Sequence, residues 1–153
     1  MDIRLATPSD APGISRLITR LARFFTVDPS GLGAEGFLSS LQPSSIVKLV
    51  TAANYTYYVG HEGEDMVGTV ALRDNSHLFH LFVAEDFHRQ GKGRHLWEHA
   101  KAAAMEAGNT GRFTVNSTVF GVPAYESLGF KVVGPKTETL GIAYVPMVLD
   151  STV

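Results

Sequence analysis

The sequence contains no cysteine among its 153 residues. This absence excludes disulfide bonds, thiolate metal sites and a cysteine nucleophile. No apolar run approaches the roughly 18 residues that a membrane-spanning helix needs. The first ten residues, MDIRLATPSD, also lack the basic and apolar regions of a signal peptide. We therefore expect a cytoplasmic protein without a membrane partner.

An excess of positive charge is also missing. The chain carries 13 Lys and Arg against 15 Asp and Glu, which gives a formal net charge of −2. A general nucleic-acid binder would present a basic surface, so we expect no nucleic-acid partner. The length and the 44% hydrophobic content suit one soluble domain with a buried core, and we expect residues 1–153 to form it.

Apolar periodicity predicts an alternation of strands and helices. Strands are expected at residues 3–6, 54–60, 66–73, 77–83, 112–117, 131–134 and 142–150. Helices are expected around residues 14–21, 37–41, 94–107 and 123–129, with a loop at 28–36. Gly108 and Gly129 stand where the last two helices should end. This order predicts a single-domain α/β fold built on a mixed sheet.

A basic, glycine-rich stretch, FHRQGKGRHLW, occupies residues 87–97 between an expected strand and an expected helix. The first N–H groups of a helix have no partner inside the helix, and the helix dipole favours negative charge there. Glycine at 91 and 93 lets the backbone approach a phosphate closely. The stretch therefore predicts a site for a di- or polyphosphate; the alternative is a solvated basic turn.

Two common phosphate-binding patterns do not fit this stretch. A P-loop needs glycine where Asp86 stands and serine or threonine where Gly93 stands. The dinucleotide fingerprint needs a third small residue where Leu96 stands. A zinc site is not expected either, because His95 and His99 lack the glutamate of the zinc-protease pattern. We expect no metal.

A third pattern does fit. The segment His88-Arg-Gln-Gly91-Lys-Gly93, after a strand ending in LFV, resembles the acetyl-CoA loop of the GNAT family of N-acetyltransferases. His88 departs from the glutamine or arginine usual at the first position. A second match follows at residues 115–130, VNSTVFGVPAYESLGF, which resembles the closing motif of that family. The order of expected elements matches along nearly the full chain.

The resemblance implies an acyl-CoA N-acyltransferase fold, with a mixed, mostly antiparallel sheet flanked by helices. It implies acetyl-CoA as co-substrate, with the pantetheine arm pairing like a strand where two sheet strands separate. The pyrophosphate would rest on backbone N–H groups of the loop. The cofactor-binding residues so implied are Leu81, Phe82, Val83, His88, Arg89, Gln90, Gly91, Lys92, Gly93, Arg94 and Asn116.

The resemblance also assigns catalytic roles. Tyr125 holds the tyrosine of the closing motif and would protonate the departing thiolate. His77 starts its strand, where several branches of the family place a general base; His80 and ordered water are the alternatives. Strand alternation predicts that His80 faces away from His77, Phe79, Leu81 and Val83.

We therefore expect an N-acetyltransferase in which a primary amine of a small molecule or peptide attacks the thioester directly. The alternative is a non-catalytic coenzyme A-binding sensor or interaction module, and a structural protein is a third option. The N-terminal helices are expected to set acceptor specificity. The sequence leaves the acceptor open, and it leaves open whether the protein is a monomer or a homodimer.

Overall fold

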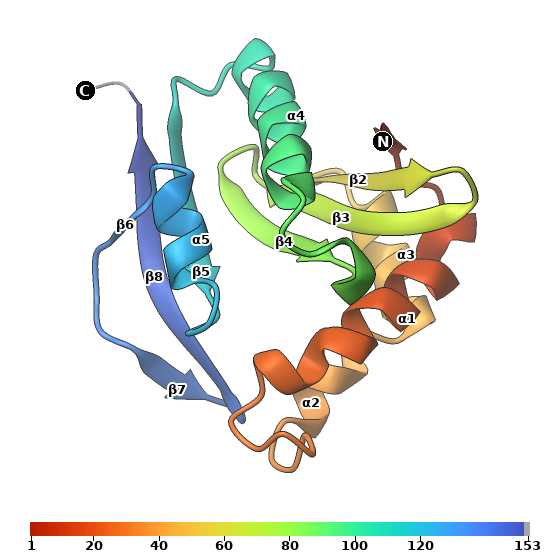
Figure 1. The fold of residues 1–153 in the computed structure, drawn as a ribbon, viewed down its shortest axis with the longest axis vertical. Coiled ribbons are helices and arrows are strands. Elements are labelled where there is room, and N and C mark those ends of the chain that lie inside the picture. Colours follow the sequence, from red (N-terminus) through yellow and green to blue (C-terminus); the bar gives the residue numbers. More distant parts are fainter. Residues whose placement is uncertain (152–153) are drawn as a thin grey trace.

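One sheet of eight strands organises the chain (Figure 1). The computed structural model describes residues 1–151. The strands are β1 Asp2–Leu5, β2 Tyr55–Glu62, β3 Asp65–Arg73, β4 His77–Val83, β5 Arg112–Ser117, β6 Lys131–Val132, β7 Thr137–Thr139 and β8 Ile142–Asp150. Their order is β1-β2-β3-β4-β5-β8-β6, with β7 also paired to β8. Among the strands of residues 1–151, only β4 and β5 run parallel, so the predicted mixed, mostly antiparallel sheet is confirmed.

Helices cover both faces of this sheet. They are α1 Ala11–Leu21, α2 Glu35–Ser39, α3 Pro43–Thr51, α4 Lys92–Glu106 and α5 Val122–Ser127, with short 3-10 turns η1 Pro8–Asp10, η2 Ala22–Phe24 and η3 Glu85–Phe87. Buried side chains of α1 and α3 form one core cluster, the α1-side cluster. Buried side chains of α4 form a second, the α4-side cluster, on the opposite face. Within residues 1–151 no helix is long and apolar enough to cross a membrane.

The structure contains two elements that the sequence did not predict, and several predicted boundaries shift, most notably the start of α4. Helix α3 was not predicted, although Pro43 at its first turn is a typical helix start. Strand β7 was also missed, because its segment TET is short and its place depends on pairing with β8. Helix α4 begins at Lys92, not at residue 94, because Gly91 in the left-handed region already forms its N-cap. Gly108 and Gly129 end α4 and α5 with positive φ, as predicted.

Helix α1 is joined to β1 by an ion pair. The guanidinium of Arg4 binds both carboxylate oxygens of Asp10, at 2.8 and 2.9 Å. The same carboxylate accepts the backbone N–H of Thr7 at 2.7 Å, as in a capping box. The hydrogen bond from Arg4 is the largest cause that lowers the pKa of Asp10, to about 2. Residues 2–10 therefore fix where α1 leaves the sheet.

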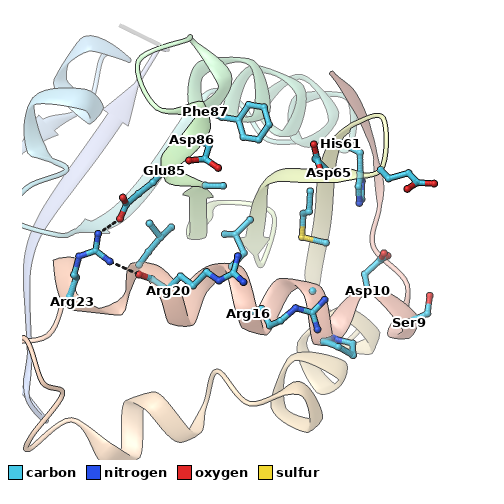
Figure 2. A pocket seen from close by; sticks show the side chains of 17 residues that line it. Ser9, Asp10, Arg16, Arg20, Arg23, His61, Asp65, Glu85, Asp86 and Phe87 are labelled. Carbon is cyan, nitrogen blue, oxygen red and sulfur yellow. Dashed lines mark hydrogen bonds and ion pairs between the residues drawn. The ribbon is translucent and has the colours of Figure 1, made fainter.

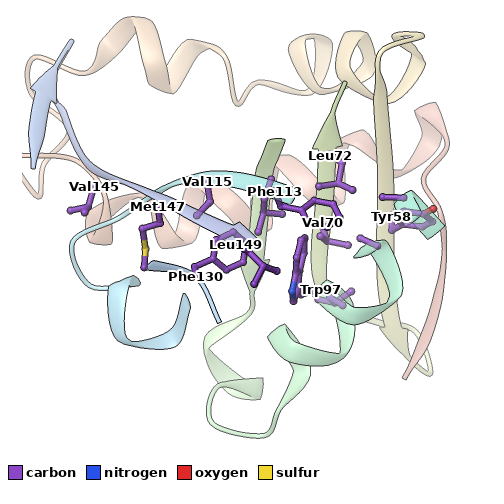
Figure 3. Packing of buried hydrophobic residues seen from close by; sticks show 14 residues of the cluster. Tyr58, Val70, Leu72, Trp97, Phe113, Val115, Phe130, Val145, Met147 and Leu149 are labelled. Carbon is purple, nitrogen blue, oxygen red and sulfur yellow. The ribbon is translucent and has the colours of Figure 1, made fainter. Parts of the chain in front are cut away.

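The α4-side cluster centres on Trp97 of α4, which is 2% exposed (Figure 3). Its ring lies edge-on to Phe113 of β5 at 5.0 Å and tilted to Phe130, just after α5, at 5.4 Å. This aromatic group ties α4 to β5 and to the segment that closes α5. The N-terminus of α4 and the β5–α5 region are thereby held in a fixed relation.

Strands β4 and β5 separate after a short paired segment. Their parallel ladder contains only the pairs His77↔Thr114 and Leu78↔Val115. Beyond it, β4 continues along β3 as far as the pair Gly68↔Val83, and β5 continues along β8 as far as Ser117. Figure 1 shows the two strands diverging. One edge of β4 is therefore left without a neighbouring strand.

A β-bulge at Phe79 lies at the start of this separation. Leu72 of β3 faces Leu78, and the next residue of β3, Ala71, faces His80, so Phe79 is the extra residue. The predicted alternation holds from His80 to Val83, but it is wrong for His77 and Phe79, which the bulge places on the same face as His80. Leu81 and Val83 pack in the α4-side cluster.

The histidines of β4 lie on the other face, the α1 side. The ring of His80 contacts the rings of Tyr57 and Phe82, which both belong to the α1-side cluster. The ring of Phe79 lies 4.6 Å from that of His80. His77 bonds to Thr114, whose neighbours in β5 point into the α4-side cluster, so His77 also faces the α1 side.

We predict that Gly68→Ala destabilises the protein by about 1–3 kcal/mol, the usual cost of overpacking. A Cβ at this position would lie 2.5 Å from the carbonyl oxygen of Phe82 and 2.8 Å from Leu96 of α4. Gly36→Ala in α2 is the matched control, because no atom lies within 4 Å of its added methyl group. Thermal unfolding measures both variants. Equal midpoints would contradict the close packing of α4 on β3.

Candidate active site

The loop between β4 and α4 presents a row of backbone donors. Arg89 and Gly91 adopt positive φ, at 62° and 75°, and Gly91 is the N-cap of α4. The first N–H bond of α4 joins His95 to the carbonyl of Gly91, at 3.1 Å. Within residues 1–151, the amides from Arg89 to Arg94 donate to no protein acceptor. The row can therefore bind an anion by backbone groups at the helix N-terminus.

Most polar side chains of this loop are already engaged. The Nε2–H of His88 donates to the carbonyl of Val83 at 2.6 Å. Gln90 donates to the carbonyl of Asp86 at 3.3 Å. Lys92 forms an ion pair with Glu62 of β2, and Arg94 donates to the carbonyl of Ser127 of α5 at 2.9 Å. These contacts fix the conformation of the loop, and its backbone N–H groups remain available to bind a ligand.

The free edge of β4 carries the backbone groups of alternate residues. The N–H of Ala84 donates to the carbonyl of Val67 in β3 at 2.8 Å. Because antiparallel pairs alternate, the backbone groups of Phe82 then face β3, and those of Leu81 and Val83 face away from it. Any cofactor pairing along this edge therefore depends on Leu81 and Val83. Phe82 contributes its side chain on the α1 side.

Asn116 lies on the opposite arm of the separation. It is the first residue of β5 beyond the segment paired with β4, and its side chain is exposed. On its other side β5 pairs with β8, where Asn116 faces Pro146. The amide side chain can therefore reach a ligand that lies between the separated strands.

Tyr125 lies in α5, whose start is favoured by Pro123 in the first turn. Its ring packs edge-on against Phe130 at 5.6 Å, and it contacts the α4-side cluster. Within the described residues, its hydroxyl has no hydrogen-bond partner. Burial raises the pKa of this phenol above its usual value of about 10, so it stays protonated at neutral pH.

The two histidines of β4 differ in their surroundings. His77 is half-buried where β4 and β5 still pair, and its Nδ1 lies 2.7 Å from the hydroxyl of Thr114. Burial, then the charge of Arg73, lowers the pKa of His77. His80 is buried at the bulge, with its Nδ1 2.8 Å from the hydroxyl of Tyr57. Burial lowers the pKa of His80 to about 3, so this ring is neutral at pH 7.

Two contacts near the site could not be predicted from any pattern in the sequence. Arg23 of η2 forms an ion pair with Glu85, just after β4, and donates to the carbonyl of Arg20 at 2.9 Å (Figure 2). Phe24 lies edge-on to Phe120 of the β5–α5 loop, at 6.4 Å. Each contact joins residues more than 60 positions apart. Only the folded chain brings them together.

A groove of about 830 Å³ lies between α1, the β2–β3 turn and η3 (Figure 2). Arg16 and Arg20 line one wall, and Asp65 and Asp86 lie on segments opposite. The groove contains none of the predicted site residues. We therefore place the candidate site at the separation of β4 and β5, next to the predicted residues of β4, β5 and the β4–α4 loop, and not in this groove.

The chain is similar to known acetyltransferases. Residues 25–151 match the family model described as "Acetyltransferase (GNAT) domain". The PaiA N-acetyltransferase of Thermoplasma acidophilum, solved in complex with coenzyme A, matches 97% of this chain and 98% of its own, with 14% identity and a TM-score of 0.74. The sequence has no match among curated proteins.

Two further solved structures share the fold. An aminoglycoside 6′-N-acetyltransferase complexed with coenzyme A matches 97% of this chain and 96% of its own, with 12% identity and a TM-score of 0.71. The ribosomal-protein-S18-alanine N-acetyltransferase of Escherichia coli matches 97% and 92%, with 19% identity and a TM-score of 0.66. These likenesses confirm the predicted fold.

The buried ring of His80 makes stability depend on pH. An unfolded histidine binds a proton below about pH 6.5, whereas folded His80 stays neutral down to about pH 3. The contribution of His80 to the free energy of unfolding is therefore present above pH 6.5 and is lost as the pH falls below that value. We predict a loss of roughly 1.5 kcal/mol from this group between pH 6.5 and 5.

Denaturant unfolding at several pH values tests this prediction. His80→Gln should show a weaker pH dependence over this range. His95→Gln, at an exposed position of α4, should keep the full dependence. An unchanged slope in His80→Gln would contradict the assignment.

Proposed function

The chain belongs to the GNAT acetyltransferase family, and on that premise we propose that it transfers the acetyl group of acetyl-CoA to a primary amine of a small molecule or peptide. Acetyl-CoA is the co-substrate of this family, and solved relatives of the fold contain coenzyme A. The observation that carries the proposal is the row of free amides from Arg89 to Arg94, beside the unpaired edge of β4.

We propose that residues 1–153 act as one acetyltransferase domain. The family model begins at residue 25, yet the segment before it is part of the same sheet and core. Strand β1 pairs with β2 over Asp2↔His61 to Leu5↔Tyr58. Helix α1 buries Ile14, Ile18 and their neighbours in the α1-side cluster.

In the proposed complex, the diphosphate of coenzyme A rests on the amides of Arg89 to Arg94. The pantetheine arm runs back along β4 and pairs with the backbone of Leu81 and with the N–H of Val83 as an added strand. Asn116 reaches the arm from β5. His88 supports this geometry by holding the carbonyl of Val83. The thioester then lies toward the bulge at Phe79.

Acetyl transfer requires a neutral amine, because a protonated amine has no lone pair to attack with. A lysine-like amine at pH 7 lies about 3.4 units below its pKa, a cost of roughly 4.6 kcal/mol. The amine nitrogen bonds to the thioester carbon, and an amide N–H of the β4 edge stabilises the oxyanion. One such donor typically contributes about 2.7–4 kcal/mol. The intermediate then expels the coenzyme A thiolate.

Tyr125 is the proposed proton donor to this thiolate. Its hydroxyl has no hydrogen-bond partner within residues 1–151 and, as an ordinary phenol, is protonated at neutral pH. The proposed base is His77, acting through water. His80 suits this role less, because its ring is buried and its Nδ1 already lies 2.8 Å from the hydroxyl of Tyr57. Ordered water alone is the competing base.

Binding of acetyl-CoA tests the cofactor site. At a concentration 100-fold above Kd, the ligand should stabilise the fold by about 2.7 kcal/mol. For a domain of this size, the melting midpoint should rise on the order of 5–10 °C. ATP and a nicotinamide dinucleotide at equal concentration should give smaller shifts. Equal shifts with all three ligands would indicate unspecific phosphate binding and contradict the site.

Two glycine variants test whether the left-handed backbone conformation of Gly91 organises the loop. Gly91→Ala should lose most of the acetyl-CoA shift, because φ of 75° is unfavourable for alanine. Gly36→Ala in α2 is the matched control, since it lies outside the loop and no atom lies within 4 Å of its added Cβ. Equal losses in both variants would mean that the left-handed turn does not organise the site.

Turnover tests the reaction itself. The wild-type protein should release free thiol from acetyl-CoA when a primary amine is present. Tyr125→Phe should lower kcat by about 10²- to 10⁴-fold, the usual range for a general acid, with little change in cofactor affinity. A protein that binds acetyl-CoA but acetylates no amine would be the non-catalytic module. An unchanged kcat would make Tyr125 a packing residue.

The pH profile tests the base. Because burial lowers the pKa of His77, the ring stays neutral down to below pH 6.5. If His77 accepts the proton, kcat/KM should fall as the pH drops through that lowered pKa. His77→Gln should remove this acidic limb while leaving the acetyl-CoA shift intact. A limb that persists in the variant would assign the role to water or another group.

A further inference from the structure

A chain of contacts crosses the separation between β4 and β5 on the α1 side. It starts at Glu85, just after β4, which pairs with Arg23 of η2. The guanidinium of Arg23 lies 4.4 Å from the ring centre of Phe24. Phe24 then meets Phe120, just after β5. The side chains of Phe24 and Phe120 are 36% and 75% exposed, so they present apolar surface at the entrance to the separated strands.

A second row of ring contacts runs from Phe25, the neighbour of Phe24 in the sequence, to the bulge of β4. Phe25 contacts Phe37 of α2 at 5.5 Å and Phe82 of β4 at 5.7 Å. Phe82 contacts His80 at 5.3 Å, and His80 contacts Phe79 at the bulge. Phe79 and Phe82 are partly exposed. The α1 side of the separation is therefore lined by flat, apolar surfaces.

Carboxylates are few on the same side, and Glu85, which is joined to the entrance through Arg23, is neutralised by that arginine. The segments around the entrance, residues 22–42, 77–85, 112–121 and 137–145, contain only four carboxylates: Asp28, Glu35, Glu85 and Glu138. Glu85 pairs with Arg23, and Glu138 pairs with Lys136. Asp28 bonds to Ser30, and Glu35 accepts the N–H of Gly33. Asp28 and Glu35 keep their negative charge, whereas the Arg23–Glu85 pair beside Phe24 has no net charge.

We propose that the acceptor is a primary monoamine with an aromatic body, held by Phe24 and Phe120 at the entrance. The inference depends on the proposed acetyl transfer. Helices α4 and α5 cover one face of the sheet, and the cofactor takes the free edge of β4, so the acceptor approaches from the α1 side. An aromatic body gains by stacking on these rings. The Arg23–Glu85 pair beside Phe24 carries no net charge, so the entrance offers no net attraction to a second ammonium group.

Steady-state kinetics with matched amines tests the proposal. The wild-type protein with saturating acetyl-CoA is given 2-phenylethylamine, 1,4-diaminobutane, spermidine and a tripeptide with an apolar first residue. We expect kcat/KM for 2-phenylethylamine to exceed that for every other amine by about tenfold or more, the scale on which apolar pockets discriminate. A preference for either polyamine or for the tripeptide overturns the proposal.

Substitutions of Phe120 test whether the aromatic amine binds at the entrance. Phe120→Ala should raise KM for 2-phenylethylamine about tenfold and change kcat little, because it removes binding that substrate and transition state share. Phe120→Leu should retain more of the affinity. Val133→Ala is the matched control, since it removes an exposed apolar side chain elsewhere. An equal KM in Phe120→Ala and Val133→Ala overturns the assignment.

Arg23→Gln tests the charge argument. The substitution removes the cation and frees the carboxylate of Glu85, so kcat/KM for 1,4-diaminobutane should rise about two- to fivefold at low salt, the scale of an exposed ion pair. An unchanged value overturns the charge argument. The acetyl-CoA melting shift is measured in parallel. If acetyl-CoA binds and polyamines react best, only this inference fails; if no amine reacts, the proposed function fails.

Discussion

The early end of the parallel ladder between β4 and β5 is the constraint on which the site depends. If the two strands stayed paired, the outward backbone groups of Leu81 and Val83 would form hydrogen bonds with β5. The ladder stops after two residue pairs, and the bulge at Phe79 lies at that point. A bulge increases the local twist of its strand and bends it. One extra residue therefore both opens the edge of β4 and turns His80 to the α1 side.

The separation of β4 and β5 must also be maintained, and the close packing of α4 against the sheet maintains it. Leu96 of α4 packs against Gly68 of β3, the residue that pairs with Val83 of β4. Trp97 ties the same helix to β5 and to Phe130. Because α4 is packed against both arms, its N-terminus stays fixed at the end of β4. The amides of the loop and the free edge of β4 thus form one rigid surface, which suits a ligand with a diphosphate and an extended arm.

The sequence predicted the parts of this site that are local. A glycine turn between a strand and a helix is encoded within a few residues, and the residues from His88 to Arg94 lie where the pattern placed them. The bulge at Phe79 could not be predicted in this way, because it is defined by the register with β3. The ion pair of Lys92 with Glu62 and the contact of Phe24 with Phe120 join distant segments, and no short pattern marks them.

The aromatic lining also bears on how the amine loses its proton. An ammonium group that moves from water onto apolar rings loses hydration, and this loss disfavours the charged form. Its pKa therefore falls, and the roughly 4.6 kcal/mol needed to deprotonate a lysine-like amine in water becomes smaller. Neither histidine of β4 is a strong base, since burial lowers both pKa values. A surface that itself favours the neutral amine needs only such a weak base, or water, to complete the transfer.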